Sequence, residues 1–421
     1  MQFPTAPRPL PLSAPPFSTE APETSAALAG ENALAIYIHW PFCQSKCPYC
    51  DFNSYARRTI SEEQYLEAAL RELSHYADET RARPVSSIFF GGGTPSLMAP
   101  HSVGALLDRI AALWPVEGLC EITLEANPSS VESARFEGYR SSGVNRVSVG
   151  VQSLSDEQLR FLGRLHTATE AREALAIAVK YFDRMSFDLI YARPGQSESE
   201  WRAELGEALA MAHGHLSLYQ LTIEPETAFF DLSRRGKLRI PGPDLAADLY
   251  DVTQEMCEAA RLPAYEVSNH AAPGDESRHN LTYWRYGDYL GIGPGAHGRL
   301  TAGEKKYATA SVKAPAAWYA KVRDCGSGCE EHLELDPHQQ AEEALLMGLR
   351  LREGLNLATL AAKTGFGPAL KIIAPLEEEG LLQRDGDWLR ATRHGRLVLN
   401  ALVEAVAVAL EERAASADKL L

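Results

Sequence analysis

Three cysteines, Cys43, Cys47 and Cys50, lie in one short loop after the apolar run 36–40. They are four and three residues apart, a spacing that lets one loop bring three thiolates to one iron–sulfur cube. A 4Fe–4S cluster held only by cysteine needs four ligands. With three, one iron keeps an open coordination position. This pattern favours a cluster that binds a small molecule over one that only carries electrons.

The loop by itself leaves a second metal open. Three cysteines completed by His39 would also suit structural zinc. A disulfide is disfavoured, because the chain has 7 cysteines in 421 residues and shows no secretory segment. Taken alone, the loop supports a cluster and a zinc ion about equally.

The overall composition narrows the function classes. The chain is 45% hydrophobic and 23% charged, its mean hydropathy is −0.22, and its net charge is −15. This charge disfavours nucleic acid as a partner, and no apolar run is long enough to be a transmembrane segment. Residues 1–33 are rich in proline and alanine and are predicted to be a disordered tail. We therefore expect a cytoplasmic protein.

After the tail, the pattern alternates between strand and helix, which predicts an α/β fold with a parallel sheet. Six such units form a partial (β/α)6 barrel rather than a full one. The predicted strands are 34–39, 86–90, 120–126, 144–151, 184–190 and 216–222. The predicted helices lie near 61–77, 99–113, 129–141, 155–182 (in two pieces) and 197–212.

Polar and glycine-rich features follow these strands where each one ends. The cysteine loop follows the first strand and Gly91–Pro95 the second. Glu125, Gln152 and Asp188 lie late in the next three. Ligands bind at the carboxyl ends of strands in barrels and open α/β sheets. The sequence therefore predicts a binding site at this rim.

The β-α rhythm stops after the barrel, assigned to 34–225. Residues 226–330 form a barrel extension with a helix at 243–260, a strand at 264–267 and a glycine-rich segment at 291–298. Residues 331–412 read as helices followed by a hairpin at 381–390, a C-terminal α+β winged-helix-like domain, and 413–421 as a tail. The acidic run 377–379 disfavours DNA binding by this unit.

Together, the cysteine loop, Tyr37 before it, the Gly91–Pro95 turn and Glu125 resemble radical S-adenosylmethionine (SAM) proteins. The resemblance covers about 34–411 and is to the oxygen-independent coproporphyrinogen III oxidase family, in its haem chaperone branch. It implies the partial barrel of these proteins and a 4Fe–4S cluster held by the three cysteines. It also implies that Tyr37, Gly92 and Glu125 contact SAM, which the glycine permits because a side chain would block approach to its backbone.

The resemblance also implies positions for a second SAM molecule. Each has a structural alternative: Gln152 and Asp188 could cap strands, and Arg164 could be a surface charge. The sequence departs from the family where it places Ala192 and Arg193 after Tyr191. The positions implied are Tyr49, Gly93, Thr94, Gln152, Arg164 and Asp188.

Two features separate the chaperone branch from the oxidase. Phe52 stands where the oxidase has a fourth cysteine, and the segment 279–284 carries the His-Asn-x-x-Tyr-Trp motif of the chaperones. Imidazole ligates haem iron, and aromatic rings stack on the face of the haem macrocycle. We therefore take His279, Tyr283 and Trp284 as haem contacts. The alternative is that they form a buried packing patch.

The function predicted from these features is binding of haem and its delivery to haem-accepting proteins, with coproporphyrinogen III oxidation as the alternative. Because His279 lies beyond the barrel in sequence, we expect haem and cluster binding to be separable. Two further pairs, His213 with His215 and Cys325 with Cys329, are given no role.

Overall fold

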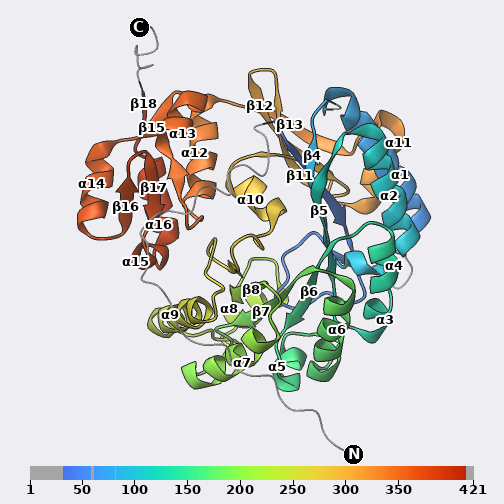
Figure 1. The fold of residues 1–421 in the computed structure, drawn as a ribbon, viewed down its shortest axis with the longest axis horizontal. Coiled ribbons are helices and arrows are strands. Elements are labelled where there is room, and N and C mark those ends of the chain that lie inside the picture. Colours follow the sequence, from blue (N-terminus) through green and yellow to red (C-terminus); the bar gives the residue numbers. More distant parts are fainter. Residues whose placement is uncertain (1–31, 58–60, 81, 414–421) are drawn as a thin grey trace, which may run out of the picture.

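The computed structural model describes residues 32–57, 61–80 and 82–413 (Figure 1). The predicted tails, 1–33 and 413–421, lie almost wholly outside the described residues.

All six predicted barrel strands are present, and they pair in parallel in chain order. Their side chains are largely buried, as expected for a parallel sheet covered by helices, except at the exposed start of the strand 116–126. These strands are β1 (Leu34–Trp40), β4 (Val85–Gly92), β5 (Val116–Ala126), β6 (Arg146–Gln152), β7 (Arg184–Tyr191) and β8 (His215–Gln220).

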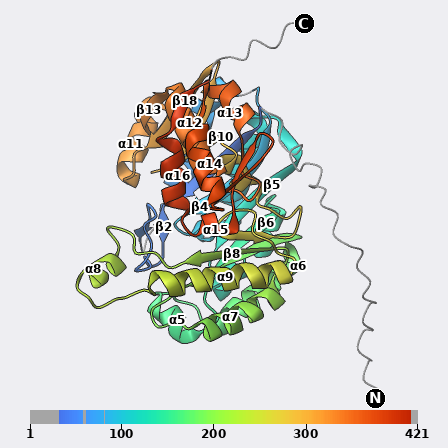
Figure 2. The same ribbon diagram turned by 90° about the vertical axis from the view of Figure 1, so that its left-hand side faces the viewer.

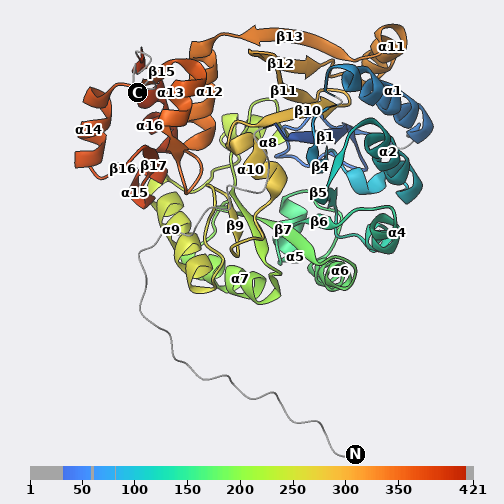
Figure 3. The same ribbon diagram turned by 45° about the horizontal axis from the view of Figure 1, so that its top comes forward.

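The predicted helices are also confirmed and lie along the outside of the sheet (Figures 1 and 3). The capping boxes Thr167 with Glu170 and Ser197 with Glu200 fix the starts of two of them. The segment predicted as one helix at 129–141 divides in two. The helices are α1 (Glu62–Thr80), α2 (Pro100–Leu113), α3 (Ser130–Ser133), α4 (Phe136–Ser141), α5 (Asp156–Phe161), α6 (Ala168–Tyr181) and α7 (Glu198–Met211).

The sheet extends beyond the six strands on both sides, which the sequence did not predict. On one side β10 (Asp288–Ile292) pairs in parallel with β1, and three antiparallel strands follow it. With one further strand on the other side, the sheet has eleven strands. The outermost strand is largely exposed and acidic, so it lacks the alternating pattern of a half-buried strand. The three are β11 (His297–Ala302), β12 (Lys305–Ser311) and β13 (Cys329–Leu335).

On the other side, the strand predicted at 264–267 is wrong. The strand there is β9 (Asn269–Ala271), antiparallel to β8, and Ala264 makes only an isolated bridge to His270. The Glu266 carboxylate accepts hydrogen bonds from the Ser268 N–H at 3.0 Å and from Asn269 Nδ2 at 2.5 Å. These local bonds close a turn where the apolar pattern suggested extended chain.

Residues 337–412 pack around a hydrophobic core of their own, beside the barrel (Figures 1 and 2). Helices are followed by a hairpin, as predicted. The elements are α12 (Pro337–Gly348), β14 (Leu355–Asn356), α13 (Leu357–Thr364), β15 (Phe366–Pro368), α14 (Leu370–Glu378), β16 (Leu382–Asp385), β17 (Trp388–Ala391), α15 (Arg393–Arg396), α16 (Leu399–Ala407) and β18 (Leu410–Glu412).

Between this unit and the barrel lies α10 (Arg278–Trp284), which contacts β4, β10 and α12 (Figure 1). The remaining helices are α8 (Ala228–Arg234), α9 (Pro243–Ala259) and α11 (Pro315–Cys325). Of these, α9 packs against α7 and α11 against α1, whereas α8 lies beside the cysteine loop. No helix within 32–57, 61–80 and 82–413 is both long and apolar enough to cross a membrane.

Candidate functional site

The three cysteines of the loop lie close together as free thiols. Cys43 ends β2 (Phe42–Cys43), which pairs with β3 (Tyr55–Ala56), and the Cys50 N–H donates to the Cys47 carbonyl at 3.2 Å. The side chains of Thr94 and Ser54 lie next to the Cys43 thiol. The loop therefore presents three thiols beside the turn that follows β4.

That turn fits against the loop only because it is made of glycine. The Gly93 N–H donates to the Trp40 carbonyl at 2.6 Å, and the Thr94 N–H to the Phe42 carbonyl at 2.9 Å. A Cβ on Gly93 would lie 2.6 Å from the Phe42 oxygen. Gly92 has a φ of +109°, and a Cβ there would lie 2.6 Å from the His39 ring. Both glycines are needed for this close approach.

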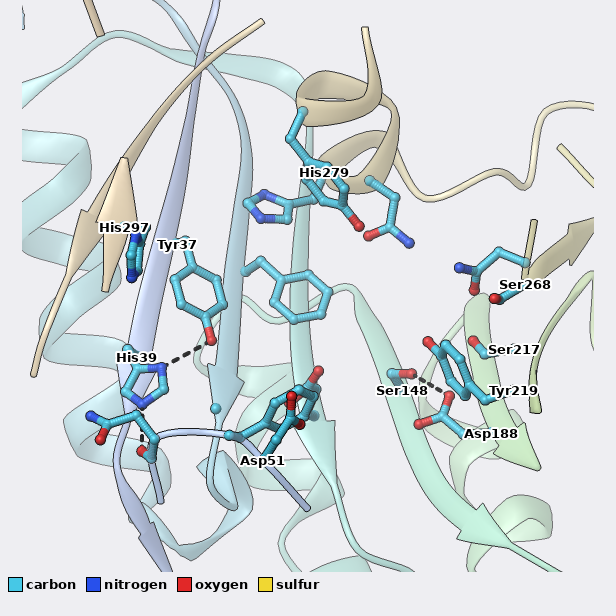
Figure 4. Close-up of a pocket in the computed structure, with 18 of the residues that line it drawn as sticks. Tyr37, His39, Asp51, Ser148, Asp188, Ser217, Tyr219, Ser268, His279 and His297 are labelled. Carbon is cyan, nitrogen blue, oxygen red and sulfur yellow. Dashed lines mark hydrogen bonds between the residues drawn. The ribbon is translucent and has the colours of Figure 1, made fainter. Parts of the chain in front are cut away.

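The geometry around His39 rules out its use as a zinc ligand. Its Nδ1 lies 3.1 Å from the Tyr37 hydroxyl and its Nε2 lies 2.9 Å from the Asn53 carbonyl, so both ring nitrogens are engaged (Figure 4). Within the part of the chain that the structure describes, no three His, Cys, Asp or Glu side chains converge on one ion. An iron–sulfur cube does not need such convergence, because each cysteine binds a separate iron. The cysteine set therefore fits a cluster.

Above the strand ends opens a cavity of about 800 Å³ (Figure 4). Tyr37 on β1, Gly92 on β4, Glu125 on β5 and Asp188 on β7 all line it, and α10 forms the opposite wall. Of the features predicted at this rim, Glu125 and Asp188 line the cavity, whereas Gln152 and the three cysteines do not. The α10 residues His279, Tyr283 and Trp284 line the same cavity.

Two buried carboxyls mark the barrel side of the cavity. Burial, together with the charge of Asp188, raises the pKa of Glu125 to about 8, although a hydrogen bond from the Gly92 backbone opposes the shift. Burial likewise raises the pKa of Asp188 to about 6, against hydrogen bonds from Ser217 and Ser148. Glu125 is therefore largely neutral at pH 7, and a ligand ammonium group placed beside it would favour its ionised form.

The other residues implied for a second SAM lie outside the lining of this cavity. Arg164 is not a surface charge, because its guanidinium is buried and donates to the Gly150 carbonyl at 2.8 Å and to Asn127 Oδ1 at 2.5 Å. It also lies 3.5 Å from Cys47 Sγ. Asn127 in turn donates to Thr94 Oγ1 at 3.2 Å. This chain of polar contacts braces the cysteine loop.

Asn127 was missed by the sequence analysis. Its position two residues after Glu125, just past the end of β5, was the available signal. Tyr49 packs against Phe229 of α8, with ring centroids 6.3 Å apart, and burial raises its pKa.

The ends of β6 and β7 are strained and clamped together. Gln152 and Ala192 have φ values of +70° and +55°, which non-glycine residues rarely adopt. Arg193 is 3% exposed and faces away from the cavity, where it pairs with Glu204 and donates to Ser153 Oγ at 2.8 Å. Its charge therefore ties the two strand ends and does not enter the cavity.

The α10 wall is built around His279, which is 5% exposed. Its ring stacks on Phe89 at a centroid distance of 4.9 Å and on Tyr37 at 6.1 Å, while Nδ1 lies 3.3 Å from Ser87 Oγ. Tyr283 meets the His279 ring edge-on at 5.9 Å. Burial lowers the pKa of His279 to about 4. The imidazole is therefore neutral at pH 7, which is the form that ligates a metal.

A buried carboxylate holds α10 against the barrel. Glu121 on β5 accepts hydrogen bonds from the His279 N–H and the Ser277 hydroxyl, each at 3.3 Å. Burial raises the pKa of Glu121, but the charges of Arg146 and Arg184 outweigh it, so the pKa lies below its usual value. A negatively charged carboxylate at the start of a helix is stabilising, because the helix dipole is positive at that end.

These inward-facing polar groups were also missed by the sequence analysis. The sequence feature that could have revealed them is the recurrence of polar residues at every second position of buried strands, at 121, 123 and 125 and at 146 and 148. His215, to which the sequence analysis gave no role, also lines the cavity, and its Nε2 lies 3.0 Å from the Tyr265 hydroxyl.

Comparison with known proteins agrees with this site. Residues 37–206 match the family model described as the radical SAM superfamily, and residues 335–398 match that of the HemN C-terminal domain. A solved structure of coproporphyrinogen III oxidase (HemN) from Escherichia coli superposes with a TM-score of 0.75 at 23% identity and covers 91% of both chains. The partial barrel with its three-cysteine loop is therefore that of a radical SAM protein.

Relatives found by sequence have a higher identity to this chain than the solved structure has. The chain is 38% identical to the Bos taurus protein named radical S-adenosyl methionine domain-containing protein 1, mitochondrial, over 94% of this chain and 92% of that one. It is 38% identical to heme chaperone HemW from Escherichia coli, over 88% of this chain and 97% of that one. The chain belongs to the family of radical SAM proteins that these two represent.

Proposed function

We propose that this protein is a haem chaperone, which binds haem, a 4Fe–4S cluster and SAM and delivers haem to acceptor proteins. The observation that carries the proposal is His279, a neutral imidazole on the wall of a large cavity, flanked by aromatic rings. Several relatives bear the name heme chaperone HemW, which supports the same function.

In this proposal Cys43, Cys47 and Cys50 hold the cluster. Tyr37, Gly92 and Glu125 would contact SAM, and the buried Glu125 carboxyl would interact with its amino group. When bound, the cluster would supply an electron and an open iron position to SAM. The buried Glu125 and the glycine turn would orient that ligand and keep water from it. A second SAM at Tyr49, Gly93, Thr94, Gln152, Arg164 and Asp188 stays a prediction.

The alternative is an oxygen-independent coproporphyrinogen III oxidase. The shared fold with the E. coli oxidase favours it. Against it stands Phe52, which is 58% exposed on the cysteine loop and lines the cavity. By resemblance, the oxidase has a cysteine at that position.

One experiment separates the two functions. The full-length protein, reconstituted anaerobically with iron and sulfide, is titrated with haem and then mixed with apomyoglobin as a model acceptor. In parallel, it is incubated with coproporphyrinogen III, SAM and a reductant. We expect haem to bind and to transfer, with no carbon dioxide released. Sustained decarboxylation without haem binding would replace the chaperone with the oxidase.

We also propose the division of the chain into 34–225, 226–330 and 331–412, in which the last unit packs on the barrel and serves for docking an acceptor. A cytoplasmic location remains part of the proposal, although some relatives are named mitochondrial. Fractionation of cells that express the tagged protein tests the location.

A further inference from the structure

One cavity residue comes from the C-terminal unit. Arg350 follows α12 and lines the same cavity as His279. Its guanidinium carbon lies 4.7 Å from the centroid of the Trp284 ring, within the range of a cation–π contact. Since α12 lies beside α10 in Figure 1, this contact joins the C-terminal unit to the α10 wall. The side chain is thus held in place at the cavity.

Arg350 lacks an anionic partner in the described part of the chain. Its guanidinium carries five N–H donors, yet none of them makes a hydrogen bond or ion pair, and its Nε is buried without a partner. Two arginines in the same region are fully paired. Arg285 binds Glu353 at 2.6 Å and Arg299 binds Glu343 at 2.8 Å. Arg350 differs from both.

Trp284 also has a buried hydrogen-bond donor without a partner among the described residues. This donor is the indole Nε1–H. The buried indole N–H of a tryptophan ordinarily has a partner. Two adjacent residues at the cavity wall therefore have unused donors.

The nearest buried acid does not satisfy these donors. Glu266 also lines the cavity, and the positive charge of Arg350 acts to lower the pKa of its carboxyl, against the effect of burial. Its carboxylate, however, is bonded to the turn at Ser268 and Asn269, and burial raises its pKa. Glu266 forms no ion pair with Arg350 and leaves the arginine free to bind another anion.

We propose that Arg350, together with the Trp284 N–H, binds a carboxylate of the cargo, which for haem is a propionate. This inference rests on the proposed haem chaperone function. A planar guanidinium suits a carboxylate because it can donate two parallel hydrogen bonds. The ring contacts run from His279 to Tyr283 at 5.9 Å and on to Trp284 at 4.8 Å. The proposed iron ligand and the proposed anion site therefore lie along one wall of the same cavity.

The consequence is that the C-terminal unit is part of the cargo site. A motion of this unit relative to α10 would remove the Arg350 contact, while Trp284 and the iron ligand His279 would stay together on α10. Such an arrangement lets an acceptor that docks on the C-terminal unit loosen the haem.

The test compares haem with its dimethyl ester, in which both carboxylates are blocked. Affinities of the full-length, cluster-loaded protein are measured by absorbance titration in the same detergent. We expect wild type to bind haem roughly tenfold more tightly than the ester, because charge-assisted hydrogen bonds are lost with the ester. Arg350→Met should remove this preference, and Arg350→Lys should keep part of it.

Two controls come from the chain itself. Arg352 lies two residues away, outside the cavity lining, and is 3.9 Å from Glu258. Arg352→Met should bind both ligands as wild type does. Lys313 is another cation that lines the cavity. If Lys313→Met rather than Arg350→Met removed the preference, the anion site would lie there and our assignment would be wrong.

The outcomes also separate this inference from the proposed function. Equal affinities of wild type for haem and ester would overturn the carboxylate site and leave the chaperone function intact. Failure of wild type to bind haem at all would overturn the function itself. Should Arg350→Met not fold, judged by its circular dichroism, the comparison of wild type with Arg350→Lys decides the matter.

Discussion

The two walls of the cavity are held in place by different means. On the barrel wall, main-chain contacts fix the cysteine loop: Gly93 and Thr94 donate to the carbonyls of Trp40 and Phe42. On the α10 wall, side chains do this work, through the stacked ring of His279 and the Glu121 carboxylate. The comparison leads us to expect that changes of backbone shape have their largest effect on the cluster side and changes of single side chains on the α10 wall.

The largest effect should follow from removing a cluster ligand. Replacing Cys43, Cys47 or Cys50 with alanine should abolish the broad visible absorbance of the reconstituted protein, which in wild type should accompany about four irons per chain. Iron assay and absorbance spectroscopy measure both quantities. The other four cysteines serve as matched controls and should be replaceable without loss of iron, since they lie away from the loop: Cys120, Cys257, Cys325 and Cys329. Retention of the full cluster in all three loop variants would remove the basis of the cluster assignment.

The next effect tests whether the backbone itself fixes the barrel wall. Gly93→Ala should destabilise the protein by ~1–3 kcal/mol, because the new Cβ would lie 2.6 Å from the Phe42 oxygen. Urea unfolding and iron content are the measurements. Gly118→Ala is the matched control, as nothing lies within 4 Å of a Cβ there. Equal stability and iron content in both variants would show that the turn yields easily and that the contrast between the walls is false.

A third prediction concerns how far the two walls are independent. His279→Ala should weaken haem binding roughly tenfold or more through loss of an iron ligand, with a shifted haem absorbance band and unchanged iron content. The sequence suggested that SAM binding would be untouched. However, the His279 ring stacks on Tyr37, so we expect the SAM affinity to fall by about tenfold at most, the size of one lost aromatic contact.

Haem and SAM titrations of the same preparation measure both effects. The control is His101→Ala, because His101 is exposed on α2. An unchanged haem spectrum in the His279 variant would make the α10 motif structural.

The sequence predicted the parts of the molecule that local patterns determine. The six central strands and the cysteine loop follow from buried runs and from residue spacing, and all appear at the expected places. The extension from β10 to β13 was not predicted. The exposed segment 329–335 is a strand because it pairs with a strand distant in sequence, and its own residue pattern does not indicate one.

The candidate site shows the same division. Spacing pointed to Cys43, its place in a strand to Glu125 and the family motif to His279. None of these could show that Glu125 and His279 share one cavity, since that depends on how α10 folds back over the barrel. Nor could they show Arg350, which reaches the cavity from a separate unit. Contacts between residues far apart in sequence carry no local signature.

The smallest effect concerns the proton on Glu125. The folded-state pKa of this carboxyl, about 8, lies above its value in the unfolded chain, because burial and Asp188 disfavour the charge. A group of this kind contributes stability that is fully present below the unfolded pKa and is lost as the pH rises through the folded pKa. The unfolding free energy of the SAM-free protein should therefore fall as the pH rises from about 5 to 8.

Glu125→Gln should remove that part of the pH dependence, because the amide is neutral at every pH and similar in shape. Chemical unfolding at pH 5.5, 6.5 and 7.5 measures the slope in both proteins. Added SAM should flatten the slope in wild type but not in the variant, since its ammonium group would favour the ionised carboxylate. Identical slopes in wild type and variant would mean that Glu125 is already charged in the folded protein, held so by a cation on the barrel wall. The two walls would then differ in charge as well as in how they are built.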